Sequence, residues 1–463
     1  MLRFFRHYIP VTLFLLGLAE TLILLVSIHL GTMLSVALPL LSDNPGGNGA
    51  PLWVKAMAYS VAMLCGLVAM GFYQREQRDA PVATLLRLLF GFGIGLVVMG
   101  LVSLVFPGLM VRPFVFGVAL ASSFLGIATC RLVCFATTDA RFSRRVLVLG
   151  VGERALQIEN LRRASDRVGI TLIGYVDIGV GPQMVNSAAV IRPTGSLLEL
   201  ARRFAADEIV IAIDDRRKGL PVNEILDCKM EGIRILEEGT FLERQLGKIR
   251  LDALHPSQVI FSDGFTQAVL KKTEKRILDV AIASLLLLLS LPLFVLAALA
   301  IYLESGGPIL YRQQRVGLRG KNFDIFKFRS MRVDAERNGP VWAEQGDSRT
   351  TRVGRVIRRF RVDELPQLLN VLKGDMSFVG PRPERPEFVA DLARAIPYYE
   401  LRHHVKPGIT GWAQISYPYG ASIKDAREKL QYDLYYLKNY SIFLDINILL
   451  QTAQVILLGK GVR

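Results

Sequence analysis

Cysteine and histidine are both scarce in this chain. Its 463 residues include four cysteines and five histidines. No pair of cysteines has the Cys-x-x-Cys spacing, and the histidines form no metal-ligand pattern. The sequence therefore supports neither a disulfide framework nor a zinc site.

Acidic residues are in deficit as well. The chain has 41 Asp or Glu against 56 Lys or Arg, a net charge of +15 at pH 7. Such an excess favours anionic partners, which are phosphates, acidic lipid head groups or nucleic acid. Hydrophobic residues make up 51% of the chain, and its length suggests roughly three domains of about 150 residues each.

Charge is nearly absent from four long stretches near the amino terminus, at about 11–34, 52–73, 84–106 and 113–136. Each approaches or exceeds the roughly 20 residues that an α-helix needs to cross a bilayer. Basic residues precede the first stretch and follow the second and fourth, but the loop SDNPGGNGAP after the first has none. The positive-inside rule then places both ends in the cytoplasm. We therefore predict a transmembrane four-helix bundle over residues 1–140.

The next segment has the pattern of a soluble α/β domain. Residues 144–163, RRVLVLGVGERALQIENLRR, indicate a buried strand, a glycine turn and a helix. ITLIGYVDI and EIVIAI indicate further buried strands. These alternating elements predict a Rossmann-like α/β middle domain over residues 141–258.

A nucleotide-binding motif occurs in the glycine turn, but it is weak alone. Gly150, Gly152 and Ala155 fit G-x-G-x-x-A, which lets backbone N–H groups approach a phosphate at a helix start. Asp177 lies somewhat farther along the chain than the acidic residue of a dinucleotide site. We favour a retained fold with a packing or regulatory role, and leave nucleotide binding open.

Residues 280–303 form a fifth apolar run without any charge. Ser290 and Pro292 lie at its midpoint, where proline bends a helix and a serine hydroxyl helps to cover the freed backbone groups. Basic clusters flank both sides, so a straight span would place one of them outside the cell. We therefore predict a re-entrant helix hairpin over 277–304, with arms of about 12 residues that are too short to cross. The alternative is a fifth span.

The region that follows is strongly basic. From residue 312 to 361 there are 14 Lys or Arg against 5 Asp or Glu. Within it, RTTRVGRVIRRFR (349–361) spaces apolar residues as on a helix, which suits an anionic membrane interface. A solvated basic face is the alternative. No nucleic-acid-binding module accompanies this charge, so we predict no nucleic-acid partner.

Asp363 and Glu364 stand side by side directly after this basic region. Adjacent residues on a helix point about 100° apart, so the pair suits two separate tasks, nucleophilic attack and binding of a divalent cation. Pro366 is compatible with the first turn of a helix, whose dipole favours ionised carboxylates. The alternative is structural: Asp363 caps a helix and Glu364 pairs with Arg361.

Two further basic motifs suit phosphate binding. Arg382 lies between Pro381 and Pro383, which stiffen the backbone around a guanidinium. Lys327 and Arg329, in FKFRSM, are expected to share one face of a strand. An ordinary turn and solvated side chains are the alternatives.

Together these motifs resemble the bacterial sugar transferase family, the monotopic polyprenyl-phosphate phosphoglycosyl transferases. The matching pieces follow the apolar hairpin in family order over about residues 272–463: GPILYRQQRVGLRGKNFDIFKFRSMRVDAE, RVDELPQLLNVLKGDMSFVGPRPE, VKPGITGWAQI and YDLYYLKNYSIFLDINIL. Four amino-terminal spans and a degenerate nucleotide-binding-like domain resemble the large members, such as the transferases that initiate exopolysaccharide or O-antigen synthesis.

The resemblance implies a reaction, a location and a fold. A UDP-sugar gives its sugar 1-phosphate to undecaprenyl phosphate, with release of UMP, at a mainly α monotopic catalytic domain over 272–463. The protein is then a multi-pass protein of the bacterial inner (cytoplasmic) membrane, in contact with membrane lipids, with its catalytic domain on the cytoplasmic face. A homodimer is an open alternative, and the sugar and the pathway are also open.

The resemblance also assigns roles to residues. Asp363 matches the nucleophile, and Glu364 matches the ligand of Mg²⁺. Arg382 contacts the donor, and Lys327 and Asp433 match further active-site positions. Expected substrate contacts are Arg329, Arg361, Pro381 and Pro383.

Two other functions are weighed against the transferase. A membrane-bound nucleotide-sugar epimerase or dehydratase usually carries a Tyr-x-x-x-Lys pair, but Tyr175 is the only tyrosine between 144 and 255, and Gly179 stands four residues after it. A non-enzymatic scaffold of a polysaccharide assembly complex would tolerate replacement of Asp363.

Overall fold

The computed structural model forms two compact units, the first ending at Leu246 and the second beginning at Gly247, apart from the first few residues of the chain. The described residues are 2–4, 7–9, 11–38, 49–73, 81–141, 143–161, 164–167, 169–179, 181–193, 195–215, 217, 219–254, 256–261, 264–265, 269–333, 335, 349–418, 420 and 422–458. The loops 39–48 and 74–80, which contribute to the predicted membrane orientation, lie outside them.

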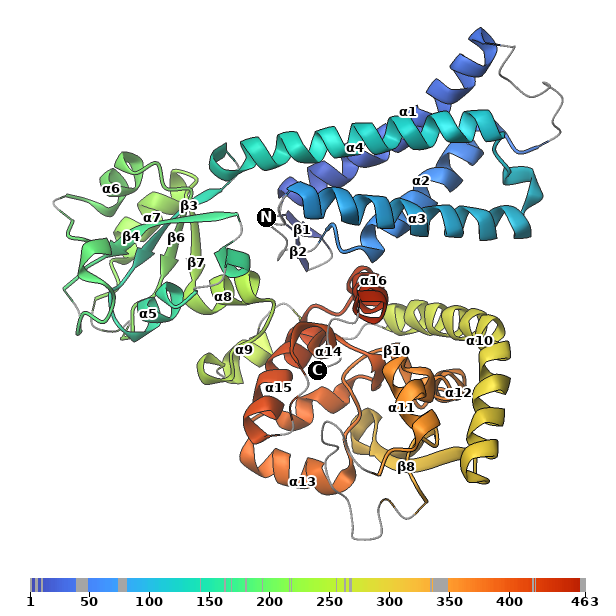
Figure 1. Ribbon diagram of the computed structural model, residues 1–463. Helices are drawn as coiled ribbons and strands as arrows, with labels where there is room; N and C mark the ends of the chain where they lie inside the picture. Colours follow the sequence, from blue (N-terminus) through green and yellow to red (C-terminus); the bar gives the residue numbers. More distant parts are fainter. Residues whose placement is uncertain are drawn as a thin grey trace. The chain divides into compact units, whose positions relative to one another are not determined.

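The first unit begins with four long apolar helices, shown in blue to cyan in Figure 1. They are α1 (Val11–Ala37), α2 (Leu52–Ala69), α3 (Pro81–Val105) and α4 (Pro113–Arg141). A short pair of strands, β1 (Leu2–Phe4) and β2 (His7–Ile9), precedes them, and the turn η2 (Pro107–Leu109) joins α3 to α4. Each of the four helices is long and apolar enough to cross a membrane.

One apolar core joins the four helices. Its buried side chains include Leu24 and Ile28 from α1, Tyr59 and Met63 from α2, Leu88 and Phe92 from α3, and Ala119 and Ile127 from α4. Many of their other apolar side chains are exposed, for example Leu104 at 81%. In a soluble protein such surface would be unfavourable, whereas a bilayer accommodates it.

A buried ion pair lies among these apolar helices. Arg131 of α4 pairs with Glu20 of α1, with Nε 2.6 Å from Oε1 and Nη2 2.8 Å from Oε2. Tyr73, just after α2, donates a hydrogen bond to the same carboxylate. Charged groups in such surroundings are stable only when paired, so this contact ties α1, α4 and the end of α2 together.

The rest of the first unit contains a five-stranded parallel sheet in the order β5-β4-β3-β6-β7. The strands are β3 (Arg144–Leu149), β4 (Ile170–Val176), β5 (Val190–Ile191), β6 (Glu208–Ile211) and β7 (Arg234–Glu237). The connections contain α5 (Glu153–Glu159), η3 (Ala164–Arg167), η4 (Ser187–Ala189), α6 (Leu197–Arg203) and α7 (Val222–Met230), and α8 (Glu238–Leu246) follows β7.

Alternation along β3 shows that both faces of this sheet are covered. Val146 and Val148 are buried in one apolar cluster, whereas Leu147 and Leu149 are buried in the other. Successive side chains of a strand point to opposite faces, so β3 lies between two apolar layers. This explains the continuous apolar run VLVL in the sequence.

The glycine turn after β3 is filled by a carboxylate of the same unit. Asp214, which follows β6, accepts hydrogen bonds from the backbone N–H groups of Glu153 and Arg154, each at 2.9 Å. A Cβ on Gly152 would lie only 2.0 Å from Asp214 Oδ2. Asp177 accepts from Gly179 N at 2.8 Å. In a dinucleotide site a phosphate would bind at the amino end of α5. Here the Asp214 carboxylate accepts the hydrogen bonds of the N–H groups at that position.

The second unit begins with a segment that the sequence placed at the end of the middle domain. Trp412 Nε1 donates to the Gly247 carbonyl at 2.7 Å, and Lys248 pairs with Glu428 at 2.7 Å. These contacts explain why residues from 247 onward group with the second unit. The turn η5 (Leu251–Ala253) and helix α9 (Pro256–Phe261) follow.

Helix α10 (Val269–Ser305) contains the predicted hairpin and includes Pro292. Figure 1 shows it bent sharply. Proline has no N–H to donate and its ring clashes with the preceding turn, which accounts for a bend in an otherwise continuous helix. Ser290 Oγ donates to the Leu287 carbonyl at 3.4 Å. The helix that contains Pro292 is therefore bent, and the re-entrant path through a membrane stays a prediction.

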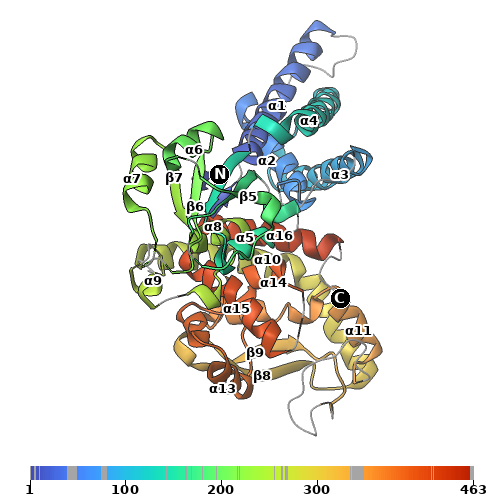
Figure 2. The same ribbon diagram turned by 90° about the vertical axis from the view of Figure 1, so that its left-hand side faces the viewer.

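A two-stranded antiparallel sheet follows α10 (Figure 2). It pairs β8 (Leu310–Val316) with β9 (Asn322–Phe328), and the turn η6 (Leu318–Gly320) joins them. Next come α11 (Arg352–Arg359), the short turn η7 (Val362–Glu364) and α12 (Gln367–Lys373).

The remainder of the second unit is mainly helical. A small parallel pair of strands, β10 (Ser377–Val379) and β11 (Gly408–Thr410), lies among α13 (Pro386–Ala395), η8 (Tyr399–His404), α14 (Trp412–Ser416), α15 (Ile423–Lys438) and α16 (Ile442–Leu458). Aromatic side chains of α15, including Tyr435 and Tyr436, are fully buried against these elements.

Candidate active site

The two adjacent carboxylates lie in η7, directly before α12. Arg361, at the start of η7, has a φ of 58°, so the chain turns there in the left-handed region. This turn buries both Asp363 and Glu364, each 9% exposed. Pro366 occupies the position directly before Gln367, so the pair lies close to the amino end of α12, as expected from the sequence.

Glu364 is surrounded by three cationic side chains. Arg382 Nη2 lies 3.1 Å and Lys327 Nζ 3.5 Å from its Oε1. Arg361 Nη1 lies 3.4 Å from Oε2. Burial alone would raise the pKa of Glu364, but the three cations outweigh it and hold that pKa well below its ordinary value.

Asp363 has a different environment from its neighbour. The structure gives it no hydrogen bond or salt bridge with another described residue. Burial and the charge of Glu364 raise the pKa of Asp363 to about 6, against the opposing effect of Lys327 and nearby arginines. Asp363 is thus a buried carboxylate that is ionised at neutral pH and forms no ion pair with another described residue.

Lys327 lies in β9 and Arg329 follows directly after it, and the two side chains have different partners. Lys327 faces Glu364, and burial lowers the pKa of Lys327. Arg329, 6% exposed, donates from Nη2 to the Ser305 carbonyl at 2.9 Å and the Gly306 carbonyl at 2.6 Å. The structure thus places Arg329 at the carboxyl end of α10, so its substrate contact stays a prediction.

Arg382 reaches Glu364 from the Pro-Arg-Pro segment (residues 381–383), which continues from β10 through Gly380. A Cβ on Gly380 would lie 2.3 Å from the Lys406 carbonyl oxygen, so only glycine allows this close approach to the chain before β11. Backbone hydrogen bonding then joins Gly408 N to the Pro381 carbonyl at 3.0 Å.

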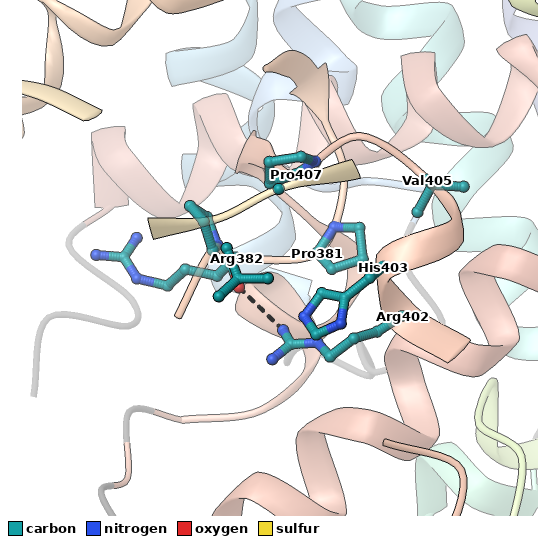
Figure 3. Close-up of a pocket in the computed structure, with 9 residues that line it drawn as sticks. Pro381, Arg382, Arg402, His403, Val405 and Pro407 are labelled. Atoms are coloured by element: carbon teal, nitrogen blue, oxygen red, sulfur yellow. Dashed lines mark hydrogen bonds between the residues drawn. The ribbon is translucent and has the colours of Figure 1, made fainter. Parts of the chain in front are cut away.

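Two arginines hold the other carbonyls of the Pro-Arg-Pro segment. Arg315 Nη1 donates to the Pro383 carbonyl at 3.1 Å, and Arg402 Nη2 donates to the Arg382 carbonyl at 2.9 Å. Figure 3 shows the second contact, in a hollow behind the segment. The residues lining this hollow are Val316, Gly317, Pro381, Arg382, Pro383, Arg402, His403, Val405 and Pro407.

Among the described residues, Asp433, a predicted active-site residue, pairs with Arg402 and not with a cation that contacts the carboxylate pair. Its Oδ2 is 2.9 Å from Arg402 Nη2, and Asp433 is 2% exposed. Burial raises the pKa of Asp433 to about 6, against the opposing charge of Arg402. Arg402 could not be predicted as a site residue, because one arginine within YELRHHVKPG carries no pattern of its own.

The carboxylate pair also fits a hard divalent cation such as Mg²⁺. No group of three or more His, Cys, Asp or Glu that could hold a metal occurs among the described residues, so at this site they offer at most the pair. Mg²⁺ is commonly held by one or two carboxylates with substrate phosphates. The Arg361 side chain at Glu364 Oε2 is 41% exposed and can move aside into solvent.

Known proteins resemble the part of the chain that contains this site. Residues 270–459 match the family described as bacterial sugar transferase. The chain is 43% identical over 236 residues to the UDP-N-acetylgalactosamine-undecaprenyl-phosphate N-acetylgalactosaminephosphotransferase of Aeromonas hydrophila. The aligned region covers 51% of this chain and 55% of that protein. It is 32% identical over 328 residues to the UDP-glucose:undecaprenyl-phosphate glucose-1-phosphate transferase of Xanthomonas campestris pv. campestris, covering 67% and 66%.

These matches therefore span just over half of the first relative and about two thirds of the second. A shorter relative, the UDP-glucose:undecaprenyl-phosphate glucose-1-phosphate transferase of Caulobacter vibrioides, is 45% identical over 185 residues, 40% of this chain and 69% of that protein. Asp363, Glu364 and the Pro-Arg-Pro segment all lie within the family match. On its sequence, the chain belongs to the bacterial sugar transferase family.

Proposed function

We propose that this protein transfers a sugar 1-phosphate from a UDP-sugar to undecaprenyl phosphate. The observation that carries the proposal is the contrast within the carboxylate pair. Glu364 is held by three cations, whereas Asp363 is buried beside them without a partner among the described residues. A nucleophile must be ionised and unengaged, while groups that bind phosphate must be cationic.

The proposed reaction has two steps. The Asp363 carboxylate attacks the sugar-linked phosphorus of the donor, and the phosphoanhydride bond to UMP breaks as UMP leaves. A phosphate oxygen of undecaprenyl phosphate then attacks the same phosphorus, and the bond to Asp363 breaks. The carboxylate is regenerated, and the products are UMP and undecaprenyl-diphosphate-sugar.

The three cations around Glu364 have the role of charge neutralisation in this scheme. Phosphoryl transfer depends on positioning and on stabilising charge on the phosphoryl oxygens, more than on proton transfer. Arg382 and Arg361 offer planar donor pairs to phosphate oxygens, and Lys327 offers a compact charge from the buried side. Glu364 keeps these cations together in the free enzyme.

Glu364 would hold Mg²⁺. A bound Mg²⁺ would neutralise further charge on the donor diphosphate. The protein residues alone orient the attack, because Asp363 is fixed by η7 and Arg382 by the carbonyl contacts of the Pro-Arg-Pro segment.

A membrane location follows from the apolar helices and the lipid acceptor. We propose that α1–α4 span the bacterial inner membrane and that α10 enters it as a re-entrant hairpin from the cytoplasmic side. On α11 and directly after it, Val356 and Phe360 are 57% and 62% exposed among arginines, which suits the anionic membrane surface. The carboxylate pair then lies where an undecaprenyl phosphate head group can reach it.

The middle domain is proposed to be Rossmann-like without a bound nucleotide. Asp214 takes the two N–H groups that a phosphate would need, and Asp177 bonds to its own loop. Together with the missing Tyr-x-x-x-Lys pair, this disfavours the epimerase or dehydratase alternative.

Replacing Asp214 by alanine is expected to destabilise the middle domain without opening a cofactor site. Two N–H groups at the start of α5 lose their acceptor, which typically costs about 1 kcal/mol. Thermal unfolding of the full-length protein, with and without NAD⁺, measures both effects. We expect a lower midpoint for Asp214→Ala and no NAD⁺ effect on the unsubstituted protein; stabilisation of the latter by NAD⁺ would contradict this assignment.

The pH dependence should follow Asp363. Since burial and Glu364 raise its pKa to about 6, the nucleophile is protonated below that pH and ionised above it. The kcat/KM for the UDP-sugar is therefore expected to rise with pH and level off above about 6. Initial rates of UMP release between about pH 5 and 8 test this, and a rate that is flat over this range would contradict it.

UMP release from a panel of UDP-sugars, with purified protein, Mg²⁺ and undecaprenyl phosphate, tests the reaction class. The relatives named above are described as transferring N-acetylgalactosamine phosphate or glucose phosphate, so both donors belong in the panel. We expect UMP from at least one donor. Release of UDP instead would indicate ordinary glycosyl transfer, and a scaffold would release neither nucleotide.

A further inference from the structure

Arg402 contacts the Pro-Arg-Pro segment through the backbone carbonyl of Arg382. This guanidinium is 7% exposed and belongs to η8. Its Nη2 donates to the Arg382 backbone carbonyl at 2.9 Å (Figure 3). Its Nη1 donates to the Tyr399 hydroxyl at 2.6 Å. Arg402 therefore contacts the backbone of the residue whose side chain reaches Glu364.

Asp433 in turn fixes Arg402. Its carboxylate Oδ2 lies 2.9 Å from Arg402 Nη2, with both side chains almost fully buried. A buried guanidinium without a counter-charge is strongly unfavourable. The position of the Asp433 carboxylate therefore determines the position of the Arg402 guanidinium. Glu384 and Lys429 also act on this pair electrostatically.

We propose that Asp433 and Arg402 are positioning residues for the donor: Asp433 orients Arg402, and Arg402 fixes the Arg382 backbone so that the Arg382 guanidinium meets the donor phosphates. This inference rests on the proposed function. It gives Asp433 an indirect role, because neither Asp433 nor Arg402 forms a salt bridge with the carboxylate pair among the described residues.

The geometry explains why arginine stands at residue 402. The Arg402 guanidinium contacts three oxygen groups. Its Nη1 donates to the Tyr399 hydroxyl, and its Nη2 donates to the Arg382 carbonyl and pairs with the Asp433 carboxylate. The planar fork of arginine has fixed donors in separate directions, whereas lysine has one compact ammonium group. In Arg402→Lys the charge is kept but the Arg382 carbonyl loses its fixed donor. A misplacement of roughly 1 Å in a positioned group can cost about 100-fold in rate.

The test uses per-site kinetics of the full-length protein. The amplitude of the UMP burst without acceptor counts active sites, and kcat/KM for the UDP-sugar is normalised to that count. For Arg402→Lys we expect kcat/KM per active site to fall at least about tenfold. For Tyr399→Phe we expect a smaller fall in the same quantity. A purely structural role would lower the number of active sites and leave the per-site value unchanged, which would overturn the proposal.

A mutant cycle with Arg382 separates an indirect role from a direct one. If Arg402 acts through Arg382, Arg402→Lys should cost less than about threefold once Arg382→Ala is present. A full additional loss in that background would overturn the proposal. Asp433→Asn should likewise add little to Arg402→Lys, since both act on one path.

The control is Arg394→Lys in α13, a surface arginine paired with Asp391 at 2.6 Å. Its per-site kcat/KM should stay within about twofold of the unsubstituted protein. If the unsubstituted protein releases no UMP with any donor, the proposed function itself is refuted. If the unsubstituted protein is active and Arg402→Lys has the same kcat/KM per active site, only the positioning role is refuted.

Discussion

Asp363→Asn is expected to abolish UMP release and, at the same time, to make the protein more stable. The amide cannot attack phosphorus, so the loss in rate should exceed about 1,000-fold. The gain in stability follows from the raised pKa of Asp363, about 6 against an ordinary 3.8, because keeping this carboxylate ionised opposes folding at neutral pH. The expected gain in the free energy of unfolding at pH 7 is of order 1–3 kcal/mol.

The sign of this effect sets its pH window. Below the unfolded pKa of 3.8, a carboxyl group whose pKa is raised by folding does not change the free energy of unfolding. That free energy falls as the pH rises from there through the folded pKa of about 6. The stabilisation of Asp363→Asn should therefore be present at pH 7 and absent near pH 4. Asp391→Asn, at an exposed surface pair with Arg394, serves as the control. An inactive variant that is also less stable at pH 7 would point to a structural role for Asp363.

The second large effect is expected at Glu364, with the opposite sign for stability. Glu364→Gln removes the counter-charge of Lys327, Arg361 and Arg382. Cationic groups left partly buried without a partner typically cost about 1–3 kcal/mol. UMP release should fall at least about 100-fold, because the cations are no longer held together at the donor phosphates.

The same variant tests the proposed metal ligand. If Glu364 holds Mg²⁺, Glu364→Gln should also raise the Mg²⁺ concentration that gives half-maximal rate, whereas removal of a cation-holding group alone would leave that concentration unchanged. Unfolding at pH 7 and residual UMP release against Mg²⁺ concentration measure the two effects. A Glu364→Gln variant as stable as the unsubstituted protein would contradict the role of the three ion pairs.

Apolar runs predicted the helices well, because their signal is long and local. The four amino-terminal stretches became α1–α4 with ends shifted by a few residues, and Pro292 lies within a sharply bent α10. The strands beginning at Arg144, Ile170 and Glu208 were also predicted. The two-residue strand β5 was missed because it is too short to show a period.

Contacts between distant residues could not be predicted in the same way. Pairing of Glu364 with Arg361 is local, three residues apart, and was anticipated as an alternative. Arg402 contacts Asp433 and the Arg382 carbonyl across 31 and 20 residues, and nothing in the local pattern indicates either contact. For the same reason the sequence did not show that Asp214, 61 residues from Glu153, fills the glycine turn.

The covalent step at Asp363 is the central claim, and trapping the enzyme without its acceptor tests it most directly. Purified protein is mixed with Mg²⁺ and the UDP-sugar that releases UMP, undecaprenyl phosphate is omitted, and the protein is analysed by peptide mass spectrometry. We predict a burst of UMP equal to the active sites, with one sugar phosphate on the peptide that contains Asp363. UMP release only when undecaprenyl phosphate is present, with no modified peptide, would contradict the account.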